Sequence, residues 1–137
     1  METLLGTIRS LAAYQDLLKR LRAGRQPAGL GLPRAARLPV LAALHADLNC
    51  PALLVTDRAD HALALFDELG FWSSTPRYLF AEPAPLFYER AAWGAGTRRD
   101  RLRTLIALGG HQNPLDEKPP EHPIVIASAR ALMTRTL

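Results

Sequence analysis

The chain has 137 residues with a net charge of +4, and 48% of its residues are hydrophobic. This composition excludes a disordered chain, and no apolar run reaches the roughly 18 residues that a membrane span requires. The N-terminus lacks the apolar core and cleavage site of a signal peptide, and the single Cys50 allows no internal disulfide. We therefore expect a cytoplasmic, single-domain protein without a membrane partner.

Apolar residues recur at helical spacing across residues 4–23, with charged and polar residues on the opposite side. This pattern predicts one amphipathic helix that packs on the rest of the domain and ends at Gly24 and Pro27. Basic residues gather near its C-terminal end, where cations suit the helix dipole. We interpret them as structural rather than as a nucleic-acid patch: Lys19, Arg20, Arg22 and Arg25.

Residues 28–48 read as a short apolar strand, a glycine turn and a helix, the arrangement that cradles phosphate in many α/β proteins. In a phosphate-binding loop, one glycine is followed after four residues by glycine, lysine and serine or threonine. Counting from Gly31 places Ala36, Arg37 and Leu38 at those three positions. The segment therefore matches the spacing of the motif but not its chemistry.

These replacements remove what the motif needs. The methyl group of Ala36 resists a positive φ and a close approach of the backbone to phosphate, and Leu38 offers a metal ion no oxygen. Pro33 and Pro39 remove two backbone donors. We interpret the segment as a vestigial phosphate loop that binds no cofactor, and an ordinary strand-to-helix turn is the alternative. The residues of this loop are Gly31, Arg34, Ala36, Arg37 and Leu38.

Strands and helices alternate along the rest of the chain. Apolar runs predict strands at 52–56, 77–81 and 124–128, with the first buried on both faces, and helical spacing predicts helices at 59–69, 97–108 and from 129 to the end. With the strand before the glycine turn there are four strand–helix repeats. They predict an α/β fold with a parallel sheet and helices on both faces, a degenerate, P-loop NTPase-like three-layer domain.

Two loops interrupt this pattern. Residues 82–95 are rich in proline and aromatic residues and read as an ordered loop at the carboxyl edge of the sheet, where α/β folds place their sites. Residues 109–123 have the composition of a flexible connection. In the helix at 97–108, Thr97 and Asp100 suit a capping box. Its arginines are expected to be mostly exposed: Arg98, Arg99, Arg101 and Arg103. Candidate loop or docking residues are Tyr88, Glu89, Arg99 and Arg101.

No catalytic or metal site emerges from the remaining residue types. The histidines lack a glycine-flanked nucleophile, so we interpret them as solvent-facing or structural: His45, His61, His111 and His122. Cys50 reads as a small buried apolar residue rather than a thiolate. The acidic residues of the loop at 109–123 have no recognisable metal-ligand spacing.

Taken together, these segments resemble the N-terminal, excinuclease B-like module of bacterial transcription-repair coupling factors. The resemblance runs from about residue 4 to residue 137 and is carried by order and spacing. Its marks are the degenerate loop at 31–38, ALLVTDRADHALALFDELGFW at 52–72, PLFYE at 85–89, RDRLRTLIAL at 99–108 and IVIASARALM at 124–133.

The resemblance implies that the chain is a fragment of a large parent protein, an ATP-dependent DNA translocase that removes stalled RNA polymerase and recruits excinuclease A to nucleotide excision repair. The family's N-terminal module does not hydrolyse ATP, so this chain would not be an enzyme. Its partners would be the other domains of the parent, and through the parent excinuclease A, RNA polymerase and DNA. Residues 82–96 are too short for the DNA-gripping hairpin of excinuclease B.

Two rival functions remain open. The first is a functional nucleotide-binding domain in which Arg37 replaces the lysine, and nucleotide-dependent stabilisation would reveal it. The second is a DNA-binding module of a helicase-like repair protein, which would use the arginines of residues 97–108. Affinity that falls steeply with salt would reveal that function.

Overall fold

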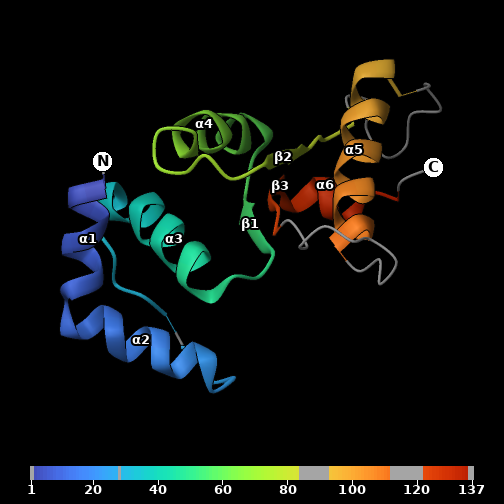
Figure 1. Ribbon diagram of the computed structural model, residues 1–137. Coiled ribbons are helices and arrows are strands. Elements are labelled where there is room, and N and C mark those ends of the chain that lie inside the picture. Colours follow the sequence, from blue (N-terminus) through green and yellow to red (C-terminus); the bar gives the residue numbers. More distant parts are fainter. Residues whose placement is uncertain (1, 28, 84–92, 112–121, 136–137) are drawn as a thin grey trace. The chain divides into compact units, whose positions relative to one another are not determined.

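The structure is a computed structural model that describes residues 2–27, 29–83, 93–111 and 122–135 (Figure 1). The chain forms two compact units. The first unit comprises Met1–Cys50 and Glu68–Ser73, and the second comprises Pro51–Asp67 and Ser74–Leu137. Within the described ranges, no helix is both long and apolar enough to cross a membrane.

The first unit is built on three helices, α1 (Glu2–Ser10), α2 (Ala12–Arg22) and α3 (Arg34–Leu48). The prediction of one helix over residues 4–23 was wrong, because Leu11 adopts an extended conformation with φ −69° and ψ 130°. The break lets both α1 and α2 contact α3. The small core between the helices has Tyr14, Leu18 and Ala43 at its centre.

Asp47 on α3 ties the three helices together. Its carboxylate accepts hydrogen bonds from the Tyr14 hydroxyl at 2.6 Å and from Arg9 Nε at 3.0 Å, and its backbone carbonyl accepts one from Arg22 at 2.9 Å. Burial raises the pKa of Tyr14 above its ordinary value, and the hydrogen bond to Asp47 raises it further. The basic residues near the end of α2 thus include one, Arg22, with a structural role.

The strand expected before α3 is missing, and that prediction was wrong for the described part of the segment. Residues 29–33 form no strand and α3 begins directly at Arg34, after Pro33. Glycine and proline are poor strand formers, and these residues lie between Pro27 and Pro33. At its other end, α3 is closed by Asn49 in the left-handed conformation, whose N–H donates to the His45 carbonyl at 3.0 Å.

The second unit contains a sheet of three parallel strands, β1 (Ala52–Thr56), β2 (Arg77–Phe80) and β3 (Ile124–Ser128), in the order β1-β3-β2. The strands predicted at 52–56 and 124–128 are confirmed at those bounds. The central strand β3 is buried along its whole length. In contrast, β1 lies at an edge and exposes Leu53 and Val55, so its predicted burial on both faces was wrong.

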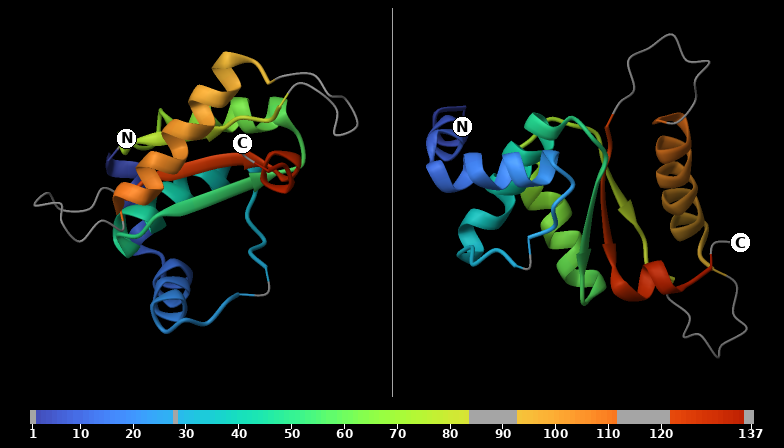
Figure 2. Two further views of the ribbon diagram at one scale, coloured as in Figure 1. Left: turned by 90° about the vertical axis from the view of Figure 1, so that its right-hand side faces the viewer. Right: turned by 90° about the horizontal axis from the view of Figure 1, so that it is seen from below.

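The helices α4 (Ala59–Leu69) and α5 (Ala95–His111) lie on opposite sides of this sheet (Figure 2). The chain passes from β1 across β3 to β2 and then returns to β3, and right-handed crossovers in opposite directions place their helices on opposite faces. The predicted parallel α/β sheet with helices on both faces is confirmed, with three strands among the described residues where four were expected. The degenerate P-loop arrangement is not confirmed.

Two helix boundaries correct the sequence predictions. Because α5 begins at Ala95, Thr97 lies inside the helix and does not cap it. The last helix, α6 (Ala129–Met133), is short and stops at Thr134, which is extended, so the helix expected to run to the chain end was wrong. Of the two predicted loops, residues 84–92 and 112–121 lie outside the described residues, while Gly109 and Gly110 belong to α5.

Candidate functional site

The residues assigned to the vestigial phosphate loop lie at the start of α3. Gly31 is exposed ahead of the helix, and Arg34 is the first helical residue. Arg37 is also exposed, and its Nε donates to the Leu32 carbonyl at 3.5 Å. Leu38, at the position of the metal-binding hydroxyl, has only 4% of its surface exposed. The structure therefore keeps these residues together but turns Leu38 into the interior.

A phosphate cradle needs several backbone N–H groups that point to one anion. Here the N–H of Leu32 donates to the Leu30 carbonyl at 2.8 Å, and the N–H of Ala36 donates to the Pro33 carbonyl at 2.9 Å. Pro33 itself has no N–H. In residues 29–33, the described part before α3, there is also no strand to give the motif its structural context. The vestigial loop stays a prediction, and two of its backbone donors are already bonded within the turn.

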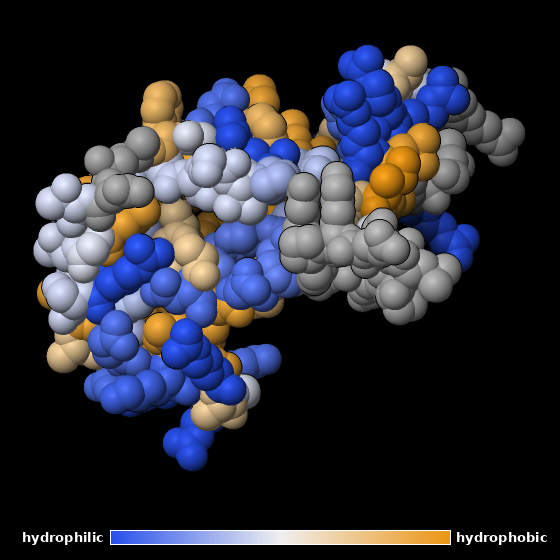
Figure 3. Space-filling view, viewed as in Figure 1, coloured by the Kyte–Doolittle hydropathy of each residue, from blue (hydrophilic) through white to orange (hydrophobic). Residues whose placement is uncertain are grey.

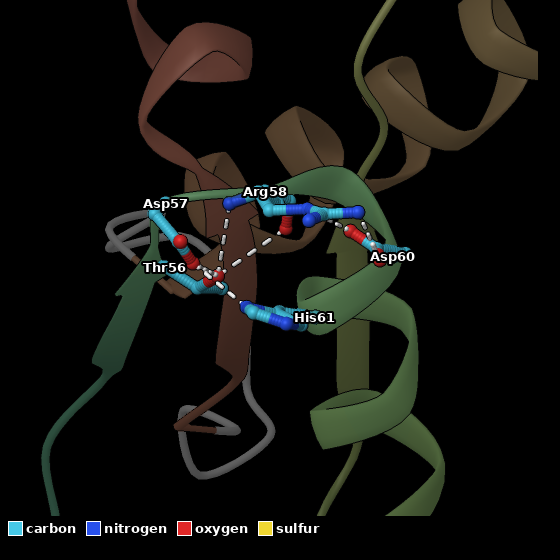
Figure 4. A network of polar contacts seen from close by, with 5 residues as sticks. All are labelled: Thr56, Asp57, Arg58, Asp60 and His61. Carbon is cyan, nitrogen blue, oxygen red and sulfur yellow. Dashed lines mark hydrogen bonds and ion pairs between the residues drawn. The ribbon is translucent and has the colours of Figure 1, made fainter.

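The carboxyl edge of the sheet is the usual site position in a parallel α/β fold. A network of polar side chains follows β1 at this edge (Figure 4). The Arg58 N–H donates to the Thr56 hydroxyl at 3.2 Å, and Asp57 Oδ1 lies 2.8 Å from His61 Nδ1. Arg58 also forms two bonds with Asp60, at 2.8 and 2.9 Å. The network joins the end of β1 to the first turn of α4.

This network perturbs its carboxylates without assembling a catalytic triad. The hydrogen bond with His61 lowers the pKa of Asp57, and the hydrogen bonds from Arg58 lower the pKa of Asp60. A histidine oriented by a carboxylate is the base half of a triad. However, the Thr56 hydroxyl contacts Asp57 and the Arg58 backbone, and the imidazole and carboxylate are both largely exposed. The arrangement stabilises the strand-to-helix turn.

A second polar cluster, missed from the sequence, lies where β2 and β3 end. Ser128 is 1% exposed, and its hydroxyl donates to Glu82 Oε2 at 2.6 Å and accepts from the Ala131 N–H at 3.0 Å. Arg130 lies 2.9 Å from the other oxygen of Glu82. A serine between an apolar strand and a helix is a typical N-cap, which was the available signal. The serine is bonded to protein groups rather than presented as a nucleophile.

Arg101 is the largest correction to the predicted site. Expected to be exposed and a candidate docking residue, it is 0% exposed. Its guanidinium lies 3.8 Å from the centre of the Phe80 ring and 5.0 Å from that of Trp93. Aromatic faces attract cations, and they attract them more strongly when water is excluded.

The hydrogen bonds of Arg101 link three segments. Nη1 donates to the carbonyls of Ala81 at 3.1 Å and Ala131 at 3.0 Å, and Nη2 donates to the Thr134 carbonyl at 2.7 Å. Burial lowers the pKa of this guanidinium, although arginine stays charged in proteins. Arg101 therefore fixes α6 against the end of β2, and it belongs to the interior rather than to a docking surface.

Of the other predicted docking residues, the structure describes only Arg99. Arg99 is exposed and lies 3.9 Å from Asp100, while Tyr88 and Glu89 are outside the described residues. Cys50 is exposed, so its predicted burial was wrong. Among the residues that the structure describes, no group of three or more potential metal ligands gathers.

No family model, curated protein or solved structure matches this chain. The description of the fold therefore rests on the geometry of the two units alone. The resemblance to the excinuclease B-like module remains an expectation from the sequence.

Proposed function

We propose that this chain is a cytoplasmic, non-catalytic scaffold and protein-docking module at the N-terminus of a transcription-repair coupling factor. The chain would derive from a nucleotide-binding ancestor whose phosphate loop no longer binds nucleotide. The resemblance in segment order and spacing supports the family assignment, and the local geometry supports the proposal that the chain neither binds nucleotide nor catalyses a reaction. The translocation of DNA and the recruitment of excinuclease A would belong to the parent protein.

The observation that carries the proposal is the position of Leu38. A nucleotide site needs a hydroxyl there to hold magnesium, whereas this side chain is apolar and buried within α3. At the carboxyl edge of the sheet, the serine and the glutamate that could contact a ligand are bonded to each other instead. Both features favour a protein that acts through its surface rather than through a reaction.

A thermal melt with and without ATP and magnesium tests the absence of nucleotide binding. A ligand at a hundred times its dissociation constant stabilises a protein by about 2.7 kcal/mol, which raises the melting temperature by several degrees. We expect no shift at millimolar ATP. A shift that is abolished by Arg37→Ala but retained by Arg25→Ala would show that the loop still holds phosphate and would overturn the proposal.

The family assignment has a separate test in the gene. If the proposal is correct, the reading frame continues beyond codon 137 into domains that carry an intact GxxxxGK[ST] motif, since the translocase needs a working phosphate loop. A stop codon directly after Leu137 would contradict the assignment to a translocase while leaving the fold and the nucleotide result unaffected.

A further inference from the structure

The helix α5 presents its apolar side chains to the outside. Leu102 is 50% exposed, Leu105 is 42% exposed and Ile106 is 72% exposed. They follow the spacing i, i+3, i+4, so they form one stripe along the helix. In the space-filling view, hydrophobic surface lies directly beside hydrophilic surface over α5 (Figure 3).

This orientation follows from what occupies the inner face of α5. Arg101 and Thr104 are both fully buried there, and Leu108 packs against the core of the second unit. The Thr104 hydroxyl donates to the Asp100 carbonyl at 2.9 Å. The hydrogen bonds of the buried Arg101 guanidinium fix the rotation of α5 about its axis. The apolar stripe therefore faces away from the sheet.

Positive charge lines this stripe. Arg98, Arg99 and Arg103 are all exposed. At helical spacing, Arg98 lies one turn before Leu102 in line with the stripe, and Arg99 and Arg103 lie along the side next to Ile106. Asp100 is the only acidic residue on α5, and it lies 3.9 Å from Arg99. The surface formed by Leu102, Leu105, Ile106 and the three arginines is called the α5 face below.

We propose that the α5 face docks an acidic amphipathic helix of a protein partner, an inference that rests on the docking role proposed above and names its surface. Apolar side chains of the partner would pack on the stripe, and its flanking carboxylates would pair with the arginines. Helix-on-helix packing of this kind needs anchors at the spacing that α5 presents.

Charge and polarity favour this occupant over two others. A second copy of the chain docked through the same face would place arginines against arginines, which costs free energy. A nucleic-acid backbone would satisfy the arginines but would leave the central leucines and the isoleucine without an apolar partner. An acidic helix satisfies both parts of the surface.

The test uses the whole chain and a fluorescent, helix-stabilised peptide of about 16 residues with leucines at i, i+3, i+4 and i+7 and glutamates on both flanks. Fluorescence anisotropy measures its dissociation constant. We expect binding that weakens at least about tenfold when Leu102→Ser is combined with Ile106→Ser. The matched control is Leu63→Ser on α4, where the leucine is 51% exposed, and it should leave the affinity unchanged.

The charge requirement has its own controls. The double variant Arg98→Glu, Arg103→Glu should also weaken binding at least about tenfold, whereas Arg25→Glu on the first unit should not. A peptide with lysines in place of the glutamates should not bind. All variants lie on exposed positions, and melting curves confirm that each remains folded.

Several results would overturn the inference. These are failure of the wild-type chain to bind the acidic peptide, equal binding of the lysine peptide, or affinity that is insensitive to the α5 substitutions. Self-association in analytical ultracentrifugation that is lost on Ile106→Ser would assign the face to a second copy. Salt-dependent binding of duplex DNA through Arg98 and Arg103, without peptide binding, would assign it to nucleic acid. An ATP-induced melting shift with peptide binding intact would refute the nucleotide-free function alone.

Discussion

Replacing Arg101 by methionine tests whether the buried guanidinium holds the second unit together. The substitution keeps the length and much of the volume of the side chain but removes three hydrogen bonds and two contacts with aromatic rings. It also leaves the carbonyls of Ala81, Ala131 and Thr134 without this donor. If the side chain were a surface residue, as the sequence suggested, the same change would cost almost nothing.

The magnitude follows from the contacts. Each hydrogen bond from a charged donor contributes about 1.5 kcal/mol, and each ring contact contributes about 0.5–1 kcal/mol. Methionine recovers roughly 2–3 kcal/mol of the sum, since an apolar side chain has no buried charge to desolvate. We expect a net loss of about 3 kcal/mol in the free energy of unfolding, which lowers the melting temperature by roughly 10 °C.

Urea unfolding and calorimetry measure this loss, with Arg99→Met as the control two residues away. The exposed Arg99 should change stability by less than about 0.5 kcal/mol. The stability of Arg101→Lys should lie between those of the wild type and Arg101→Met, because lysine keeps the charge but not the planar fork that reaches several carbonyls. Hydrogen exchange should also show faster opening of α6 in Arg101→Met. Equal stability of the Arg101→Met and Arg99→Met variants would refute the reasoning.

Three further predictions concern the hydrogen-bond networks. Tyr14→Phe should cost about 1–2 kcal/mol in urea unfolding because it removes the bond to Asp47. The pKa of Tyr14 is raised above 10.0 in the folded state, so its contribution to the free energy of unfolding is fully present below about pH 10 and is lost as the pH rises further. The phenylalanine variant should not show this alkaline loss of stability. His61→Ala should raise the pKa of Asp57 in a carboxyl-carbon NMR titration, because the hydrogen bond with His61 lowers it from 3.8; the associated stability is present above about pH 4 and is lost as the pH falls. Ser128→Ala should cost about 1–2 kcal/mol in thermal unfolding through loss of the α6 cap and of the bond to Glu82.

Matched changes separate these effects from general damage. Tyr78→Phe alters a second tyrosine and should leave the loss of stability at alkaline pH unchanged. Ser74→Ala changes an exposed serine outside any helix and should leave the melting temperature within about 1 °C. An Asp57 pKa that is the same in wild type and His61→Ala would remove the proposed link between the two side chains.

Local sequence patterns determined the elements of the second unit well. The apolar runs at 52–56 and 124–128 gave strands at those bounds, and the helical spacing at 59–69 gave α4. These predictions are correct because the segments are uniformly apolar or strongly periodic and are bounded by proline, glycine or polar residues. Alternation of strand and helix then restricts the fold to a parallel sheet with helices on both sides.

The candidate sites were harder to predict from the sequence than the secondary structure. The carboxyl edge could be located from the order of the elements, but the bond between Ser128 and Glu82 joins residues 46 positions apart in the chain. The expected strand before α3 failed for a local reason, since glycine and proline there outweigh a few apolar residues. At Leu11, an extended backbone conformation interrupts a helical pattern that the periodicity alone would continue.

The sequence by itself determined that residues 97–108 form a helix with several arginines and several apolar residues. Only the tertiary structure decided which side faces inward, because a guanidinium can be buried when carbonyls and rings from separate segments surround it. Ala81, Ala131 and Thr134 supply those carbonyls, and their meeting point depends on the sheet order β1-β3-β2. Burying Arg101 turned Leu102 and Ile106 outward and created the α5 face, which no pattern within the helix could reveal.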